Sequence, residues 1–461
     1  MTVTSKLFHL SRSRARRWLG LFGASLVAMT LTAGSATATI VERDRSIKTP
    51  YEFTAWDCGY AMQVTGVSTD LIHVRADNRN PDNFFFTDNY AVTETWTGPD
   101  GRFFTLSHNG QFKNVQAHQI DGSLYQFEDH ETGQPFVIAD SRGKVVYRDR
   151  GNLVSNYTYD FETGEFNFLG NQLHGPHPMF TLDLCLAVAQ LVAPFDSATH
   201  LTERPIGSTS FPNGYDEYLP PSYSSTGAKS PLLLSFNGAG ENGDGSPEAI
   251  DRLLLAGIPK YINVGGWDTA RPFVVLAMQH VEEPGFDFSP CADVNPWGGS
   301  CGMQLTHDRG NVQPAPCTLP DEVHDFIAYA LANYNVDPSR VYITGHSCGG
   351  YGVWEYLAKY GADRKVAAAV PMAGDGRPGN RADYCALGAT PLWAFHGALD
   401  DVVDPQGSIE PMTALQACPG VDADRARLTV FPDADHVGSR DPAYGGAAGD
   451  IYEWMLGFTS P

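Results

Sequence analysis

The feature that most constrains this chain is a serine between glycines, placed where a strand pattern changes to a helix pattern. Residues 345–349 read GHSCG, which fits the pattern G-x-S-x-G. The apolar run 341–344 (VYIT) predicts a buried strand before it, and 351–358 (YGVWEYLA) predicts a helix after it. Flanking glycines let the strand and the helix approach closely, so the serine lies on a sharp, strained turn at the edge of a sheet. Ser347 is therefore the candidate nucleophile.

The same five-residue pattern occurs a second time, at residues 298–302 (GGSCG). That copy lies in an insert rich in Pro, Cys and Gly, with no strand pattern before it and no helical pattern after it. A G-x-S-x-G pattern without that context is weak evidence of a nucleophile. We interpret the second copy as a loop.

The region from residue 211 to the C-terminus alternates between strand and helix patterns. Apolar residues recur at helical spacing from 323 to 334, after Pro320. Continuous apolar runs, typical of strands covered on both faces, occur at 231–236 and 273–277, and further strands fit 366–372, 391–395 and 427–431. This alternation predicts a domain over 211–461 with a mostly parallel sheet and helices on both faces.

The N-terminal region has a different pattern. Residues 39–193 contain short runs rich in Phe, Tyr, Val and Thr, separated about every ten residues by turn signals such as Asn109-Gly110 and Asp121-Gly122. This spacing predicts an all-β domain, either a sandwich or a small barrel. Residues 194–210 show no periodicity and are expected to form a linker.

The first 38 residues read as an export signal. Four arginines between Arg12 and Arg17 precede the apolar stretch 19–31, and the small residues 36–38 (ATA) offer a cleavage site. We therefore expect a secreted, extracellular protein. No later stretch is apolar for 18 residues or more, so no membrane span is expected in the mature form.

The charge balance argues against several partners. The formal net charge is −22, and without the five basic residues of the leader it is −27, from 26 basic against 53 acidic residues. Nucleic acids require a basic surface for their phosphates, so a nucleic-acid partner is not expected. Anionic membrane surfaces are disfavoured for the same reason.

Eight cysteines in an exported chain predict disulfides. Cys58 and Cys185, which bracket the N-terminal region, are one candidate pair, and Cys385 and Cys418 are another. Cys348, beside the serine, is expected to be a buried free thiol. The pairing of the three cysteines in and next to the insert remains open: Cys291, Cys301 and Cys317.

A serine nucleophile needs a base and an orienting carboxylate, in the chain order Ser, Asp or Glu, His. Asp400 follows the strand pattern 392–395, and Asp401 is the alternative. His436 follows the last strand pattern, 428–431, and is the candidate base. His396 is expected to pack under the end of its strand rather than act as the base.

Backbone N–H groups are expected to stabilise the oxyanion. One is the N–H of Cys348, at the start of the helix that follows the serine. The other is assigned to Ala239, in the glycine-rich loop 237–243 after the first strand pattern of this domain. A small residue there lets the N–H face a substrate carbonyl.

Metal and cofactor signals are weak, and neither is expected. His174 and His177 are three residues apart, but two solvated histidines in a turn are the expectation. Glu241 and Asp244 fit no known calcium loop. The aromatic residues near the insert are assigned to packing rather than to a substrate cleft: Trp267, Phe286, Phe288 and Trp297.

Residues 215–461 resemble the secreted esterases grouped with polyhydroxybutyrate depolymerases and feruloyl esterases, on the prolyl-oligopeptidase-like branch of the α/β-hydrolases. The resemblance implies an α/β-hydrolase fold, the triad Ser347, Asp400 and His436, and oxyanion donors at Ala239 and Cys348. The matching segments are 218–220 (YLP), 237–241 (NGAGE), 336–342 (VDPSRVY), 350–354 (GYGVW), 393–398 (WAFHGA), 400–401 (DD) and 432–436 (PDADH).

The chain departs from the family pattern at four positions. Asn237 stands where the family usually has His. His346 and Cys348 replace an apolar residue and Met, and Asp404 stands where Pro is common. Because Cys348 would donate only its backbone N–H, these changes are compatible with activity.

The sequence thus predicts a monomeric, secreted serine carboxylesterase that acts through an acyl-enzyme on an ester, free or polymer-linked. Two alternatives stay open. One is a serine peptidase of the prolyl-oligopeptidase-like type, because the same triad can cut amides. The other is a non-catalytic polymer-binding protein, with residues 39–190 as the binding module.

Overall fold

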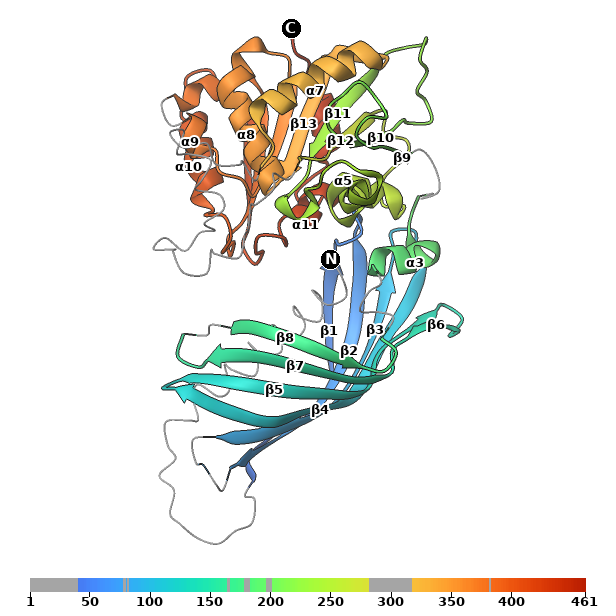
Figure 1. Cartoon of the computed structure of the whole chain (residues 1–461), viewed down its shortest axis with the longest axis vertical. Helices are drawn as coiled ribbons and strands as arrows, with labels where there is room; N and C mark the ends of the chain where they lie inside the picture. The colour runs from blue at the N-terminus through green and yellow to red at the C-terminus, as the bar shows by residue number, and fades with distance from the viewer. Residues whose placement is uncertain are drawn as a thin grey trace. The chain divides into compact units, whose positions relative to one another are not determined.

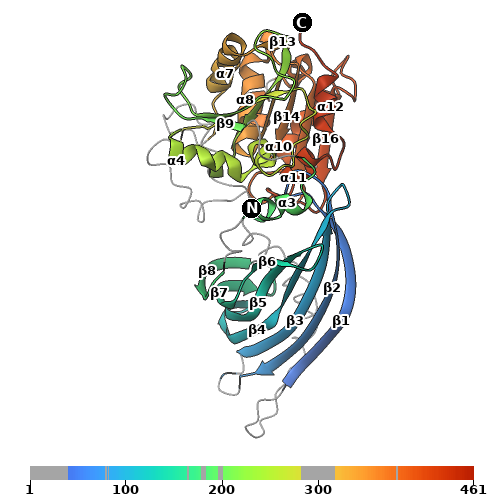
Figure 2. The same ribbon diagram turned by 90° about the vertical axis from the view of Figure 1, so that its right-hand side faces the viewer.

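The computed structural model describes residues 40–77, 80, 83–163, 166–177, 183–195, 201–281, 317–380 and 383–461 (Figures 1 and 2). The chain divides into two compact units, Met1–Ala55 with Met62–Ala193 and Trp56–Ala61 with Pro194–Pro461. The predicted export signal, the second G-x-S-x-G copy and several insert residues lie outside the described residues: Phe286, Phe288, Cys291, Trp297 and Cys301. Within the described part, no helix is long and apolar enough to span a membrane.

Unit 1 is built on one antiparallel sheet, with strand order β1-β2-β3-β4-β5-β7-β8 and β6 paired to β5. A short helix, α3 (Leu184–Val192), follows the sheet, and the Asp183 side chain caps its N-terminus. The strands are β1 (Ile40–Ala55), β2 (Met62–Ala76), β3 (Phe84–Thr97), β4 (Phe103–Asp121), β5 (Leu124–Asp140), β6 (Val145–Arg148), β7 (Gly151–Asp160) and β8 (Phe166–His174).

The all-β prediction agrees with unit 1, but the sandwich or small barrel does not. The described strands form a single sheet instead of two packed sheets. Their hydrogen-bonded pairs run from β1 at one edge to β8 at the other. The strands are also longer than predicted, because the supposed turn at Asn109-Gly110 lies inside β4. Gly110 pairs with Gly133 of β5, and a Cβ on Gly110 would lie 2.2 Å from the Thr132 carbonyl oxygen. The glycines permit a close backbone approach there.

Unit 2 contains a mixed sheet of order β16-β15-β14-β13-β11-β12-β10-β9. Strands β16 to β12 are parallel, whereas β10 and β9 are antiparallel to their neighbours. The strands are β9 (Leu201–Arg204), β10 (Tyr215–Tyr218), β11 (Ser230–Phe236), β12 (Val274–Met278), β13 (Val336–His346), β14 (Ala368–Met372), β15 (Leu392–Gly397) and β16 (Ala426–Phe431). Part of the predicted linker, β9, thus belongs to the sheet.

The helices of unit 2 follow the strands along the chain. The α-helices are α4 (Pro247–Ile250), α5 (Gly257–Asn263), α7 (Pro320–Asn333), α8 (Cys348–Tyr360), α9 (Arg377–Asn380), α10 (Gln406–Gln416), α11 (Arg440–Gly445) and α12 (Ile451–Leu456). The 3-10 helices are η2 (Ala239–Glu241), η3 (Asp251–Leu255), η5 (Gly361–Asp363) and η6 (Tyr384–Ala389).

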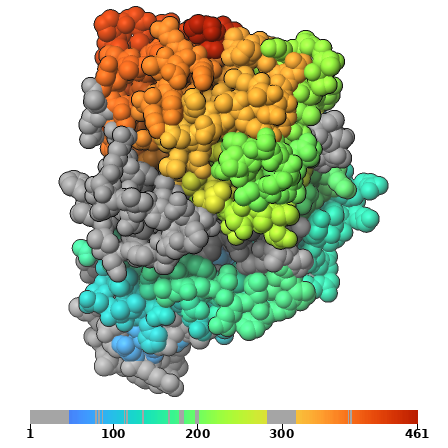
Figure 3. All heavy atoms as spheres, turned by 45° about the horizontal axis from the view of Figure 1, so that its top comes forward, coloured from blue at the N-terminus to red at the C-terminus, as the bar shows by residue number. Residues whose placement is uncertain are grey.

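Both faces of the unit 2 sheet are covered, as the apolar runs predict. Leu232 and Leu234 of β11 belong to the core on one face, with residues of α7, α8 and α10. Leu233, which points the other way, belongs to the opposite core with residues of α5, α11 and α12. Phe211 extends the first core by packing on Phe326 of α7, with ring centroids 4.6 Å apart. In the space-filling view, green atoms from the early part of unit 2 border amber atoms from about the region of α7 (Figure 3).

The parallel strands bring the candidate residues to one edge of the sheet. Ser347 follows β13, Asp400 follows β15 and His436 follows β16. Ala239 follows β11, the strand next to β13. Because parallel strands all end at the same edge, four loops distant in sequence converge there.

Candidate active site

Ser347 lies on a strained turn between β13 and α8. Its φ of 57° and ψ of −120° fall in a region that non-glycine residues rarely occupy. The Ser347 N–H donates to the Met372 carbonyl (2.9 Å), and the Ser347 carbonyl accepts from the Tyr351 N–H (3.0 Å). These two bonds tie the turn to β14 on one side and to the first turn of α8 on the other.

The flanking glycines are required by close backbone contacts. A Cβ on Gly345 would lie 2.5 Å from the Gly349 carbonyl carbon. A Cβ on Gly349 would lie 2.2 Å from the carbonyl oxygen of Phe236, at the end of β11. The turn is therefore packed directly against the neighbouring strand β11.

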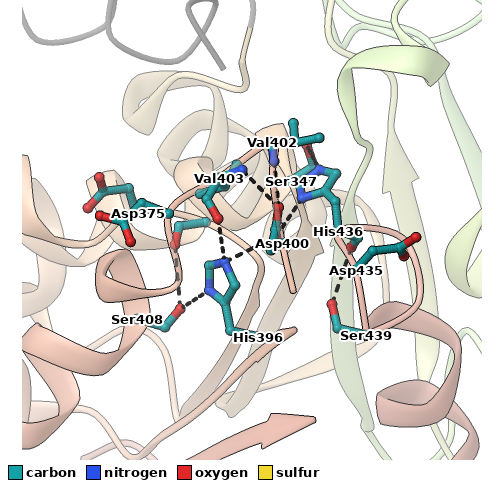
Figure 4. Close-up of polar contacts among 12 residues, drawn as sticks. Ser347, Asp375, His396, Asp400, Val402, Val403, Ser408, Asp435, His436 and Ser439 are labelled. Atoms are coloured by element: carbon teal, nitrogen blue, oxygen red, sulfur yellow. Dashed lines mark hydrogen bonds and ion pairs between the residues drawn. The ribbon is translucent and has the colours of Figure 1, made fainter. Parts of the chain in front are cut away.

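His436 connects Ser347 to Asp400 (Figure 4). Its Nε2 is 2.9 Å from the Ser347 Oγ, and its Nδ1 is 2.8 Å from the Asp400 Oδ2. A neutral imidazole fits this chain of contacts when Nδ1–H donates to the carboxylate and Nε2 accepts from the hydroxyl. The rival Asp401 is exposed, whereas Asp400 is buried, so the structure brings Asp400 to the histidine.

Asp400 accepts hydrogen bonds on both carboxylate oxygens. Oδ1 accepts from the backbone N–H groups of Val402 (2.9 Å) and Val403 (2.8 Å). Oδ2 faces two imidazoles, His436 and His396, the latter at 3.1 Å. Burial alone would raise the pKa of this carboxyl, but hydrogen bonds from His396, His436 and Val403 hold that pKa well below its ordinary range.

His396 is a site residue that the sequence analysis did not assign. It is buried at the end of β15, as expected, but its ring also contacts Asp400 (Figure 4). A histidine four residues before the candidate acid, at a strand end, is the signal that points to this contact.

His346 is buried behind His436. Its Nε2–H donates to the His436 backbone carbonyl (2.8 Å), and the two rings lie 4.8 Å apart. Burial, together with the nearby His436 and Arg440, holds the pKa of His346 well below its ordinary value. This imidazole is therefore neutral, with the proton on Nε2.

The loop that carries Ala239 is fixed by Asn237, at the position where the resembling family usually has His. The Asn237 Nδ2 donates to the Gly238 carbonyl (2.8 Å) and to the Asn242 Oδ1 (2.7 Å), and its Oδ1 accepts from the His280 N–H (2.9 Å). Ala239 begins η2 and packs against the cluster that contains Cys348. The loop therefore lies beside the turn that carries the serine.

Cys348 is not a free thiol. It forms a disulfide with Cys317, three residues before the start of α7. The expectation was wrong because Cys317 comes close only through the fold, with a Cα–Cα distance of 4.5 Å. Cys385 and Cys418 form the disulfide predicted for them. Cys58 and Cys185 are each disulfide-bonded, and their pairing with each other stays a prediction.

The weaker candidates within the described residues do not converge on a second site. His174 is exposed but His177 is buried, 3.9 Å from Asp149, so the expected turn with two solvated histidines was wrong. Trp267 packs against Tyr218 and Tyr452, as expected for a core residue. Among the described residues, no group of three or more His, Cys, Asp or Glu is arranged to hold a metal ion.

Asp244 and Glu241, which fit no calcium loop, have separate roles. The Asp244 side chain accepts from the Ser246 N–H (2.9 Å) and stabilises a turn. Glu241 is partly buried, and desolvation raises the pKa of its carboxyl, while Arg440 and the Gly238 N–H oppose the rise. The carboxyl of Glu241 thereby contacts the backbone of the loop that carries Ala239.

No protein-family model matches the sequence, and no curated protein matches it either. Among solved structures, a thermostable esterase is 19% identical, with a TM-score of 0.41 over 82% of this chain and 97% of that chain. A feruloyl esterase module from Clostridium thermocellum is 14% identical, with a TM-score of 0.39 over 57% and 89%. A prolyl endopeptidase is also 14% identical, with a TM-score of 0.34 over 88% and 74%. These scores are too low to assign an activity.

Proposed function

We propose that this chain is a secreted serine hydrolase that cleaves carboxylic esters. The observation that carries the proposal is the buried chain of contacts from the Ser347 Oγ through His436 to Asp400, with spacings of 2.9 and 2.8 Å. Hydrogen-bond reach between a nucleophile, a base and an orienting acid is the geometry that activates a serine. The disulfides are compatible with an extracellular protein.

In the proposed reaction, the Ser347 Oγ attacks the ester carbonyl carbon while His436 Nε2 takes the hydroxyl proton. Asp400 fixes the tautomer of His436 and stabilises the imidazolium that forms. The tetrahedral intermediate collapses to an acyl-enzyme, and His436 returns the proton to the leaving alcohol. A water molecule then gives a proton to His436 and attacks the carbonyl carbon of the acyl-enzyme. The carboxylic acid leaves, and His436 returns the proton to the Ser347 Oγ.

The negative charge on the tetrahedral intermediate needs donors that are already in place. We assign them to the backbone N–H groups of Ala239 and Cys348, supported by the position of Cys348 as the first residue of α8. A helix N-terminus presents N–H groups and positive dipole to an anion. Loss of one such donor typically costs about 10²–10³ in rate.

Labelling with a fluorophosphonate tests the nucleophile. The wild-type chain is expected to label and Ser347→Ala is not, with ester turnover lowered by about 10⁴-fold or more because the nucleophile is gone. Ser300→Ala, in the second G-x-S-x-G copy, is the matched control and should label like the wild type. Labelling that survives in Ser347→Ala, or is absent from the wild type, would contradict the proposal.

Substrate class is tested with the same protein. A p-nitrophenyl ester series of increasing acyl length, methyl ferulate and a polyester film probe the acyl and alcohol sides, and a peptide p-nitroanilide probes amides. We expect turnover of esters and far slower turnover of the anilide. Faster anilide cleavage would favour the peptidase alternative. Binding to insoluble polymers without labelling would favour the non-catalytic one.

A further inference from the structure

His396 shares the carboxylate oxygen that orients the base. Its Nε2 lies 3.1 Å from the Asp400 Oδ2, and the same oxygen lies 2.8 Å from the Nδ1 of His436. The side chains of His396 and Asp400 are fully buried. The Asp400 Oδ2 therefore lies between two imidazoles, and His436 is the one that contacts the nucleophile Ser347 (Figure 4).

The neighbours of His396 determine where its proton lies. Nε2 is close to two acceptors, the Asp400 carboxylate and the Val403 carbonyl oxygen at 3.0 Å, so it must carry a hydrogen. Nδ1 is 2.8 Å from the Ser408 Oγ, in α10. The serine hydroxyl can donate to Nδ1, because its alternative acceptor, the Gly374 carbonyl, is farther away at 3.4 Å.

We propose that His396 is a positioning residue for the hydrolysis reaction: its Nε2–H holds Asp400 and, by sharing the Oδ2 charge, sets the pH at which His436 becomes an active base. The proposal rests on the function proposed above. Each donor to a carboxylate oxygen reduces the negative charge available to the other donors. With His396 present, Asp400 divides its charge between two imidazoles, so it orients His436 while interacting less strongly with the imidazolium that forms during the reaction.

Other titratable groups surround this pair, and the test must leave them unchanged. His346 and Arg440 lie on the His436 side, from the end of β13 and from α11. Tyr351 of α8 lies on the Asp400 side. The last neighbours form an ion-pair group, in which Arg377 binds Asp375 (2.7 Å) and Asp404 (2.8 Å). None of these residues is altered in the variants below, so a changed pH profile reports on His396.

The substitutions separate the donor from the packing. His396→Gln can place an amide N–H where the Nε2–H lies, whereas His396→Leu fills the space without a donor. His396→Asn is a third choice, because the shorter amide reaches the Ser408 side instead of Asp400. His324→Leu, on α7, is the matched control, because that ring stacks on Tyr360 instead.

The experiment is the pH dependence of kcat/KM for p-nitrophenyl acetate, measured on the full chain. In His396→Leu the acid limb should move up by about 0.5–1 pH unit, because His436 binds its proton more tightly, and kcat should fall by about tenfold. His396→Gln should keep the wild-type limb, and so should His324→Leu. Should His396→Leu fail to fold, His396→Asn replaces it and should show the same shift.

Two results would overturn the proposal. One is an unchanged acid limb in an active His396→Leu. The other is an equal shift in His396→Gln and His396→Leu, which would indicate packing alone. Failure of the proposed function is distinguishable, because the wild type would then neither hydrolyse the ester nor label. In that case NMR tests the role of His396 without turnover. The downfield resonance of the proton between His436 and Asp400 should move further downfield in His396→Leu and not in His396→Gln.

Discussion

At the scale of single residues, His346 supports the base through the backbone. Its Nε2–H and the Ser439 hydroxyl both donate to the His436 carbonyl, at 2.8 and 3.2 Å. Burial keeps the pKa of His346 well below its ordinary value, so this imidazole gives the same support at and above neutral pH. His346 and His396 should therefore have different kinetic signatures, although both are buried histidines beside the site.

Replacing His346 by Leu is expected to lower kcat by about tenfold without moving the acid limb. The His436 carbonyl keeps the Ser439 donor but loses the shorter bond, so the base is less well held. His346→Gln, which can donate to the same carbonyl, should recover most of the rate. A pH profile of kcat/KM for the two variants checks this, and a shifted limb in His346→Leu would contradict it.

The sequence could place Ser347, Asp400 and His436 because each follows a strand, and parallel strands end at one edge. It could not assign the Cys348 partner, since Cys317 is 31 residues away in the chain and comes close only through folding. His396 was missed for a related reason. Its burial was expected, and its neighbours Asp400 and Ser408 are near in sequence, but whether its ring faces them depends on how the loop after β15 folds, which a single sequence does not show.

At the scale of elements, the two described disulfides attach to different parts of unit 2. Cys317–Cys348 joins the segment before α7 to the first residue of α8, beside Ser347. Cys385–Cys418 joins η6 to the residue after the C-cap of α10. They close similar lengths of chain, with sequence separations of 31 and 33 residues. The chain-entropy model therefore gives each a similar stabilisation.

Removing either disulfide by a double Cys→Ala change should lower the free energy of unfolding by about 3–4 kcal/mol. The effects on turnover should differ. Cys317→Ala/Cys348→Ala should also lower kcat, because the backbone at 348 loses a restraint, whereas Cys385→Ala/Cys418→Ala should keep the wild-type kcat at 25 °C. Urea unfolding and p-nitrophenyl acetate turnover measure both quantities. Equal loss of kcat in the two double variants would contradict the prediction.

The elements also show where turn signals mislead. Asp121-Gly122 does separate β4 from β5, but Asn109-Gly110 lies within β4. Both dipeptides, Asp-Gly and Asn-Gly, are typical of tight turns. The partner strand decides which of them forms a turn, because Gly110 faces Gly133 across the sheet and the two backbones can come close. A single sequence does not reveal which glycines face each other.

At the scale of the whole molecule, unit 2 includes a segment from far upstream in the chain. Residues Trp56–Ala61, between β1 and β2, belong to it. A Cβ on Gly266 would lie 2.0 Å from the Cys58 carbonyl oxygen, and one on Gly445 would lie 2.6 Å from the Trp56 ring. The predicted boundary at 193 missed this segment, because six residues without periodicity carry no signal of the unit to which they belong.

The stability of unit 1 should depend on pH through Asp129. This carboxyl on β5 is fully buried, and burial together with the nearby Glu131 and Glu128 raises its pKa to about 8, although the Tyr157 hydroxyl opposes the rise. In the unfolded chain an Asp ionises near pH 4. Between about pH 4 and pH 8 the folded state therefore holds a proton that the unfolded state has released. Stability falls as the pH rises through this window and levels off above it.

Asp129→Asn removes this dependence, because an amide does not ionise. The variant should unfold at nearly the wild-type temperature at pH 4.5 and at a higher temperature than the wild type at pH 8, with a gain of a few kcal/mol at most. Asp140→Asn is the control of opposite sign. Backbone N–H groups of Lys144 and Arg142 help to lower the pKa of Asp140, so its loss should destabilise unit 1 at pH 8 and matter less at low pH. Calorimetry across this pH range follows both variants, and a difference between Asp129→Asn and the wild type that does not grow with pH would exclude Asp129 as the cause.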